Sequence, residues 1–176
     1  FDQAKMLFDY GASIGMEVFF SVFKPCFVGW CERIGVKRYK IACEMRDSRV
    51  IKIIRKTNKP IIISSKTNKW GVIDKIPCLA DSQLVVLFCI PSYPAKITWL
   101  PDYYYAEPFV FQGFSDHTLG LDTAKIALAR GARVIEKHFV LKHDSCYPDD
   151  AWSMTPDELK ELVRWEKVCK EVLWLA

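Results

Sequence analysis

The sequence predicts an α/β fold in which parallel strands alternate with helices. Six short apolar runs rich in β-branched residues start about 22 to 25 residues apart. These runs are continuously apolar rather than alternating, which is typical of strands buried on both faces. Helical patterns lie between them, and repeated βα units imply parallel strands joined by right-handed crossovers.

The expected strands can be read directly from the apolar runs. In chain order they are 16–21 (MEVFFS), 38–42 (RYKIA), 60–64 (PIIIS), 84–90 (LVVLFCI), 109–115 (FVFQGFS) and 133–139 (RVIEKHF). Two architectures use such units, an open doubly wound sheet and a closed (β/α)8 barrel. A complete barrel needs eight strands and usually about 250 residues. With six strands in 176 residues, this sequence alone does not make one, and we expect a single domain over residues 1–176.

The expected helices fall between the strands and end at recognisable signals. The clearest patterns are 1–12, 26–34, 46–57 and 121–131, with weaker ones over 66–80 and 95–108. The last helix begins at the stretch TPDEL, where Thr155 can cap, Pro156 suits the first position and Glu158 completes a capping box. Gly35 and Gly131 stand where helices should stop before the next strand.

Charge and hydropathy argue against two classes of partner. The formal net charge is +4 and is spread along the chain, so we expect no nucleic-acid partner. The longest apolar run, Leu84–Ile90, is far too short to span a bilayer, so we expect no membrane partner. Seven cysteines form no CxxC pair, which favours free thiols and a cytoplasmic location. Because Phe1 begins the chain inside a helical pattern, we expect further sequence before it.

Polar side chains stand at the carboxyl ends of several expected strands. Residues two apart on a strand share a face, so Ser115 lies with His117 and Glu136 lies with His138. In βα folds ligand sites form at these strand ends. Lys40, in the middle of an apolar strand, needs an anionic partner, which could be a structural glutamate or a phosphate or carboxylate of a substrate.

Two imidazoles at equivalent positions of successive strands suit a shared divalent metal. Mn²⁺, Fe²⁺, Co²⁺ and Zn²⁺ all fit His117 and His138 with open positions, and Asp149 or Glu44 could add an oxygen ligand or hold a water. Other interpretations stay open for individual residues. A strand-end histidine is often only hydrogen-bonded, and His143 lies in a polar loop where solvation suffices.

Structural roles are equally open for several other polar residues. Ser64 could cap the following helix. Tyr93 stands between two prolines and could be a turn residue. Glu136 and Lys137, as neighbours, could form an ordinary ion pair at the strand end.

Three motifs near the C-terminus resemble the N-acetylneuraminate (sialic acid) synthase family. They are GFSDHTLG (113–120), GARVIEKHF (131–139) and PDDAWSMTPDEL (148–159), in the order and spacing of that family. Upstream, RYKIACE (38–44), KPIIIS (59–64) and LFCIPSYPA (87–95) resemble its strand 4, 5 and 6 motifs. The resemblance covers essentially the whole chain and is strongest over 112–163.

The resemblance implies an incomplete TIM barrel with six of the eight βα units, strands 3 to 8. The first two strands and the family's C-terminal antifreeze-like domain are absent from this sequence. The implied reaction condenses phosphoenolpyruvate with an N-acetylated amino sugar, typically N-acetylmannosamine, to give a nonulosonic acid and phosphate. It implies a requirement for Mn²⁺ or Mg²⁺ and a homodimer, or another assembly that covers the open sheet edges.

The family's functional residues can be carried over position by position. The resemblance implies these roles: His117 and His138 bind the metal, Lys40 meets phosphoenolpyruvate, Ser64 and Ser115 bind its phosphate or carboxylate, Tyr93 and Asp149 lie on the sugar side, and Glu44 is a catalytic base with Lys40 as the other catalytic residue. Three positions depart from the family, because Val22, Cys43 and Pro91 replace its usual residues. The alternative is therefore a non-catalytic, metal-binding remnant of the barrel with a binding or structural role.

Overall fold

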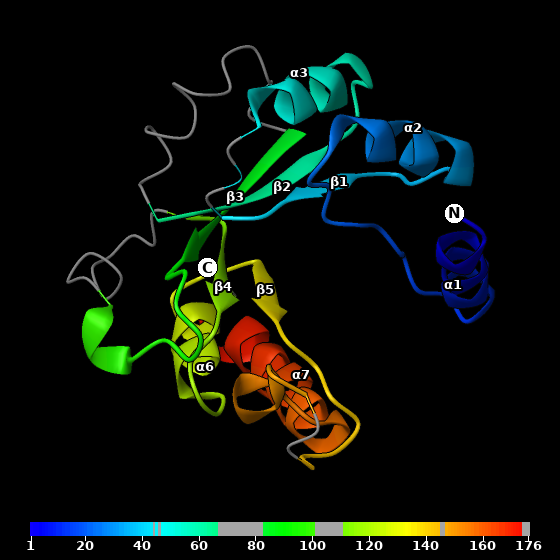
Figure 1. Ribbon diagram of the computed structural model, residues 1–176. Coiled ribbons are helices and arrows are strands. Elements are labelled where there is room, and N and C mark those ends of the chain that lie inside the picture. The colour runs from blue at the N-terminus through cyan, green and yellow to red at the C-terminus, as the bar shows by residue number, and fades with distance from the viewer. Residues whose placement is uncertain (44, 46, 67–82, 101–110, 145–146, 174–176) are drawn as a thin grey trace. The chain divides into compact units, whose positions relative to one another are not determined.

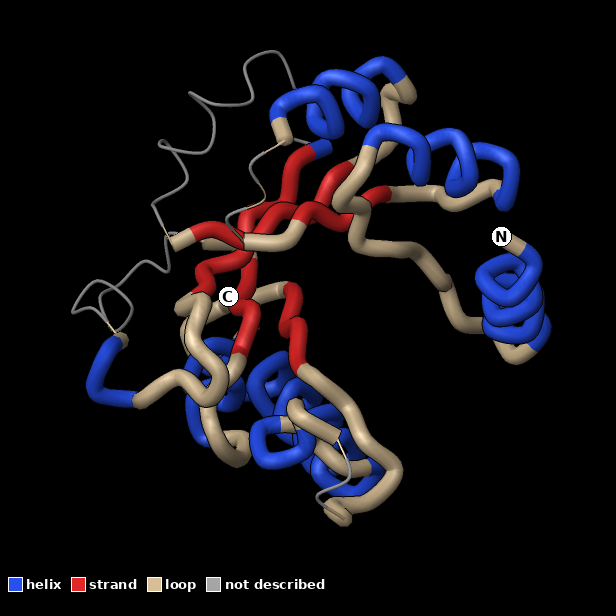
Figure 2. Tube along the Cα trace, in the orientation of Figure 1, coloured by secondary structure: helices blue, strands red, loops and turns tan. Residues whose placement is uncertain are grey.

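The computed structural model describes residues 1–43, 45, 47–66, 83–100, 111–144 and 147–173. The chain divides into two compact units, one of residues 1–63 with 73–85 and one of residues 64–72 with 86–176. Within each unit, strands that follow one another in the sequence are neighbours in a parallel sheet. A helix lies between β1 and β2, another lies between β4 and β5, and Figure 2 marks the helices and strands. The parallel βα organisation is confirmed.

The first unit contains three helices and the first strand pair. Its elements are α1 (Asp2–Ser13), α2 (Pro25–Ile34), β1 (Tyr39–Ile41), α3 (Ser48–Lys56) and the first three residues of β2 (Ile61–Ser65), whose Ser64 and Ser65 belong to the second unit. β1 and β2 are in register with Tyr39 opposite Ile61 and Ile41 opposite Ile63. All four of these side chains are buried, which explains why both runs are continuously apolar.

The first expected strand, 16–21, is not a regular strand. It makes a single parallel bridge, Ser21 to Lys40, supported by hydrogen bonds from Val22 N to Lys40 O and from Lys40 N to Phe20 O. None of the side chains from 16 to 21 is buried. The structure therefore describes five strands rather than six, because this apolar run lacks the two-sided cover that extends a strand.

The second unit carries the other strands and two packed helices. Its elements are β3 (Leu84–Cys89), the 3-10 turn η2 (Ile97–Trp99), β4 (Gly113–Asp116), α6 (Asp122–Ala129), β5 (Val134–Lys137), the 3-10 turn η3 (Asp150–Trp152) and α7 (Pro156–Leu173) (Figure 1). The helices expected over 1–12, 26–34, 46–57 and 121–131 are confirmed. Most of the weaker patterns over 66–80 and 95–108 lie outside the described residues.

The two faces of the β3–β4–β5 sheet differ in character. One row across the strands is Phe88, Phe114 and Ile135, and Ile135 packs against the core between α6 and α7. The core of that helix pair is formed by buried Ala124, Leu128, Leu162 and Cys169. The next row, Cys89, Ser115 and Glu136, points to the opposite face, because neighbouring residues of a strand alternate. Ser115 and Glu136 thus lie on the face away from the helices.

Local signals set the helix boundaries as the sequence predicts. The backbone N–H of Thr155 donates to Oε2 of Glu158 at 2.8 Å, and the N–H of Glu158 donates to Oγ1 of Thr155 at 3.4 Å, which is a capping box at the start of α7. Gly35 follows α2 with φ of 92°, a conformation that favours glycine.

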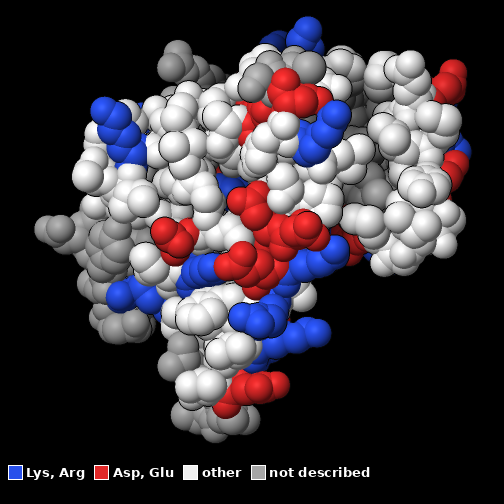
Figure 3. Space-filling view, turned by 90° about the horizontal axis from the view of Figure 1, so that it is seen from below, with Lys and Arg blue, Asp and Glu red and all other residues white. Residues whose placement is uncertain are grey.

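One face of the molecule carries charged side chains of both signs. Acidic and basic side chains are interspersed on the face drawn in Figure 3. Of the helices in the described part of the chain, none is at once long enough and apolar enough to cross a membrane.

Candidate active site

A buried ion pair joins the carboxyl ends of β4 and β5. Nζ of Lys137 lies 3.0 Å from Oδ2 of Asp116, and their side chains are 1% and 0% exposed. Lys137 also donates to the carbonyl of Thr118 at 2.8 Å, and Oδ1 of Asp116 accepts from the Thr118 backbone N–H at 2.8 Å. The suggested pairing of Lys137 with its neighbour Glu136 is wrong, because alternation along β5 places the two side chains on opposite faces.

Each member of this ion pair directly precedes a histidine, and the two imidazoles lie together. The ring centroids of His117 and His138 are 5.5 Å apart, with 62° between the ring planes. His117 is buried, and Nδ1 of its ring lies 3.9 Å from Sγ of Cys89. Burial lowers the pKa of His117, and the nearby His138 lowers it further. His117 therefore tends to stay neutral, the form in which an imidazole can bind a metal.

His138 is more open and is paired with a carboxylate. Its Nδ1 lies 3.3 Å from Oδ2 of Asp149, and the side chains of His138 and Asp149 are 33% and 53% exposed. A carboxylate at one ring nitrogen fixes the orientation of the imidazole and leaves the other nitrogen for a ligand. Asp149 is held in place by the turn η3, which begins directly after it.

Two aromatic rings enclose the histidines. The Tyr93 ring centroid lies 4.3 Å from that of His117 and 5.9 Å from that of His138. Trp152, in η3, lies 5.9 Å from Tyr93 and 6.3 Å from His138. Sequence reasoning missed Trp152, because an aromatic in a short polar segment carries no signal of what it contacts.

The two serines lie on the same polar face of the sheet. Oγ of Ser64 donates to Oε2 of Glu136 at 3.0 Å. Ser115 is buried and in register with Glu136. The helix that Ser64 was suggested to cap lies outside the described residues. Ser64 and Glu136 both belong to the second unit, and their bond ties two strand ends together there.

Three further positions singled out in the sequence are Lys40, Glu44 and His143. Lys40 belongs to the first unit, where it is buried and its Nζ donates to the carbonyl of Ile41 at 3.2 Å. Its assignment to the site stays a prediction. Glu44 lies outside the described residues. His143 is not merely solvated, since its Nδ1 lies 2.9 Å from Oδ1 of Asp150, and this hydrogen bond raises the pKa of His143.

A pocket of about 500 Å³ opens beside the paired His138 and Asp149. It is lined by residues 138–142, Asp144, Tyr147, Asp149 and Ser153. Asp149 thus contacts His138 and also lines the pocket.

Comparison with known proteins identifies the lineage of the chain. Residues 1–173 match the model of the NeuB family. The chain belongs to the NeuB family. It is 33% identical to the pseudaminic acid synthase of Helicobacter pylori, over 97% of this chain and 52% of that protein. It is 31% identical to the N,N'-diacetyllegionaminic acid synthase of Legionella pneumophila, over 96% of this chain and 51% of that protein.

Solved structures show that this NeuB-family chain shares a known fold. The crystal structure of the N-acetylneuraminic acid synthetase of Leptospira borgpetersenii aligns with a TM-score of 0.78 at 23% identity, over 96% of this chain and 62% of that one. The resemblance inferred from the motifs is therefore confirmed. The chain spans about half the length of the H. pylori and L. pneumophila relatives.

The NeuB-family chain offers two imidazoles to a metal rather than a full set of ligands. Among the residues that the structure describes, no three His, Cys, Asp or Glu side chains form a group that could hold a metal ion. His117 and His138 fit as two ligands of a divalent cation that keeps open positions, as catalytic metal sites do.

Proposed function

We propose that this NeuB-family chain is part of an enzyme that condenses phosphoenolpyruvate with an N-acetylated amino sugar of the N-acetylmannosamine type. The products are a nonulosonic acid and phosphate. The observation that carries the proposal is the His117–His138 pair, with ring centroids 5.5 Å apart, beside a pocket of about 500 Å³. Relatives named as pseudaminic and N,N'-diacetyllegionaminic acid synthases support this class of product.

His117 and His138 would hold Mn²⁺ or Mg²⁺. A divalent cation bound there supplies Lewis acidity toward the aldehyde oxygen of the sugar. The burial that lowers the pKa of His117 keeps its ring available as a ligand at neutral pH. Asp149, through Nδ1 of His138, orients the second ring.

The protein's other residues position the reactants. The methylene carbon of phosphoenolpyruvate forms a bond to the aldehyde carbon of the sugar, whose C=O π bond breaks and whose oxygen takes up a proton to become a hydroxyl. Water adds to the carbon of phosphoenolpyruvate that bears the phosphate, and the C–O bond to phosphate breaks as the 2-keto group forms. Glu44 takes the proton from that water. Lys40, Ser64 and Ser115 hold the phosphate and carboxylate, which contributes position rather than bond chemistry. Tyr93 packs on the His117 ring and limits the approach of water.

We propose a homodimer, or another assembly that covers open edges, in the cytoplasm. Every residue of β5 is only partly buried, unlike the fully buried residues of β1 and β4, which supports an association at that edge. Cys26, Cys31 and Cys169 are free thiols, which supports a reducing compartment.

A second candidate is a metal-binding remnant without catalysis. Two observations favour it: Val22, Cys43 and Pro91 replace the family's usual residues, and the expected strand 16–21 is reduced to one bridge. In this alternative the histidine pair binds a cation that supports a binding or structural role.

Metal titration combined with a turnover assay separates these candidates. Mn²⁺ binding is followed by electron paramagnetic resonance for the wild type, His117→Ala and the control His143→Ala. Phosphate release is then measured with phosphoenolpyruvate and N-acetylmannosamine. We expect His117→Ala to lose Mn²⁺ affinity and His143→Ala to keep it. Metal binding without phosphate release selects the remnant, and equal affinity in His117→Ala rejects the metal assignment.

A further inference from the structure

The indole N–H of Trp152 is a buried hydrogen-bond donor without an acceptor. Trp152 is 8% exposed, and its Nε1 has no hydrogen-bond partner among the residues that the structure describes. An indole nitrogen can donate but not accept. Buried polar groups are nearly always hydrogen-bonded in folded proteins, because a donor removed from water without an acceptor costs stability. This unpaired donor is therefore a candidate contact for a ligand.

Trp152 is held in place by the short segment that carries it. Oγ of Ser153 donates to the carbonyl of Asp149 at 2.7 Å. The N–H of Met154 donates to the carbonyl of His138 at 2.8 Å, which ties the segment to the residue that follows β5. The ring centroids of Trp152 and His138 are 6.3 Å apart. The unpaired donor thus belongs to the layer of side chains directly around the histidine pair.

The charges around the histidine pair favour an anion once a divalent cation is bound. The two positive charges of the cation exceed the single negative charge of Asp149, which lies beside His138. Lys137 does not change this balance, because Asp116 neutralises it. Carboxylate oxygens are ligands that suit Mn²⁺ and Mg²⁺. A carboxylate has two oxygens, so it can bind a cation and still accept a hydrogen bond.

We propose, resting on the metal site of the proposed function, that Trp152 donates its indole N–H to a carboxylate bound to the divalent cation at His117 and His138. Tyr93 is the outer ring of the cluster, since it is 52% exposed with its centroid 5.9 Å from that of Trp152, and its movement admits the ligand. Hydrogen bonds to ionised acceptors are stronger than those between neutral groups. Trp152 therefore favours an anion over a neutral ligand at the cation.

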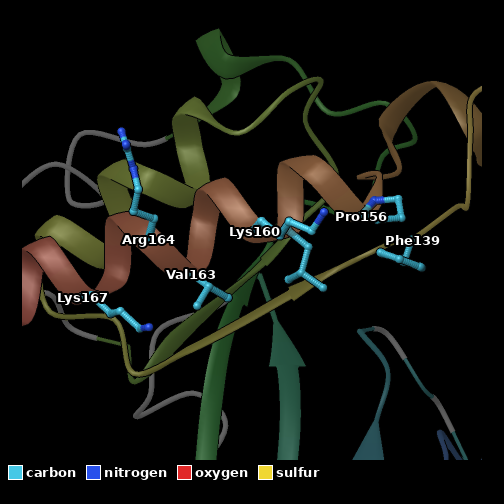
Figure 4. Close-up of a pocket in the computed structure, with 7 residues that line it drawn as sticks. Phe139, Pro156, Lys160, Val163, Arg164 and Lys167 are labelled. Atoms are coloured by element: carbon cyan, nitrogen blue, oxygen red, sulfur yellow. The ribbon is translucent and has the colours of Figure 1, made fainter.

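A second cationic place must be distinguished from this one. A pocket of about 520 Å³ runs along α7 and is lined by Phe139, Pro156, Leu159, Lys160, Val163, Arg164 and Lys167 (Figure 4). Its three cations attract anions without any metal. Trp152 is not among the described residues that line this α7 pocket. An anion bound there would leave the environment of the indole N–H unchanged.

Nuclear magnetic resonance of the ¹⁵N-labelled 176-residue chain tests the contact, with oxalate as the carboxylate probe. Of the six tryptophan indole signals, that of Trp152 is the one missing from Trp152→Phe and Trp152→Tyr. We expect oxalate to move this signal downfield with Mg²⁺ present and to leave it in place without Mg²⁺. Trp165 is the internal control, because its Nε1 already donates to the carbonyl of Lys125 at 3.0 Å. Its signal should not move.

Isothermal titration calorimetry measures what the N–H contributes to affinity. Trp152→Phe keeps an aromatic ring but removes the donor. Oxalate should bind the Mg²⁺-loaded variant about 10- to 100-fold more weakly than wild type, the range of a hydrogen bond to a charged group. Trp165→Phe and Arg164→Gln should bind oxalate like wild type, because one changes a donor that is already paired and the other changes the α7 pocket. A merely structural role of Trp152 would lower the thermal midpoint of Trp152→Phe without moving the indole signal of wild type.

The outcomes separate this inference from the proposed function. If oxalate binds Mg²⁺-loaded wild type but the Trp152 signal stays, or if Trp152→Phe binds oxalate as tightly as wild type, Trp152 is not the donor and the proposed metal site stands. If oxalate does not bind Mg²⁺-loaded wild type, the carboxylate assignment is wrong. If His117→Ala shows the same signal shift as wild type, the metal site is wrong and this inference falls with it.

Discussion

Nζ of Lys137 lies 3.0 Å from Oδ2 of Asp116, and each of these residues directly precedes one histidine of the candidate metal pair. The ion pair joins the ends of neighbouring strands, so it sets the register at which His117 and His138 emerge. Both side chains are almost fully buried, so neither charge has water as an alternative partner.

Asp116→Asn should destabilise the protein strongly. The substitution leaves the Lys137 ammonium buried without its counter-charge, which costs about 3–5 kcal/mol of unfolding free energy. Urea denaturation measures the change. Lys5→Gln is the control, because the Lys5–Asp9 pair is exposed and contributes about 0–1 kcal/mol. A loss of unfolding free energy below about 1 kcal/mol for Asp116→Asn would show that the ion pair does not stabilise the ends of β4 and β5.

Asp149→Asn should reduce metal affinity without unfolding the protein. The substitution replaces the carboxylate beside His138 with a neutral amide. Loss of a carboxylate that orients a metal-binding histidine typically lowers metal affinity about 10- to 100-fold. Electron paramagnetic resonance with Mn²⁺ gives the affinity. Asp157→Asn, which changes an exposed carboxylate at the start of α7, should leave it unaltered. Equal affinity in both variants would remove Asp149 from the site.

His143 should make a stability contribution that depends on pH. Its hydrogen bond with Asp150 raises the pKa of His143 above its ordinary value of about 6.5. A raised pKa in the folded state stabilises the protein below the unfolded pKa, and this contribution is lost as pH rises through the folded pKa. Urea denaturation of wild type and His143→Gln should therefore differ more at pH 5.5, about one unit below that value, than at pH 9. A difference independent of pH would contradict this assignment.

Gly113→Ala should be destabilising because β4 is closely packed at its first residue. An added Cβ would collide with the Val134 carbonyl oxygen and would meet Cδ2 of Leu87 at 2.7 Å. We expect a loss of about 1–3 kcal/mol, as for other overpacked positions. Gly29→Ala is the matched control, since nothing lies near its Cβ position in α2 and alanine favours a helix. Thermal unfolding of the two variants should move in opposite directions.

The sequence predicted those features that depend on local patterns. Continuously apolar runs predicted buried parallel strands, and equivalent positions on successive strands predicted that His117 and His138 would meet. Alternation along the strand already excludes Glu136 as the partner of Lys137, but selecting Asp116 requires the register between two strands, which the sequence does not give. The contact of Trp152 with Tyr93 depends on the path of a loop, which no periodicity encodes. A full strand was expected over 16–21 because the run is apolar. Apolar character alone does not show whether other parts of the protein cover both faces of the run.

The ring cluster has a consequence for how the protein is made. Its members Tyr93, His117, His138 and Trp152 come from one stretch of sequence within the second unit. Closing loops of this length costs little more entropy than closing shorter ones, because the cost grows only with the logarithm of loop length. During synthesis from the N-terminus, all four rings are therefore made before the last helix, α7.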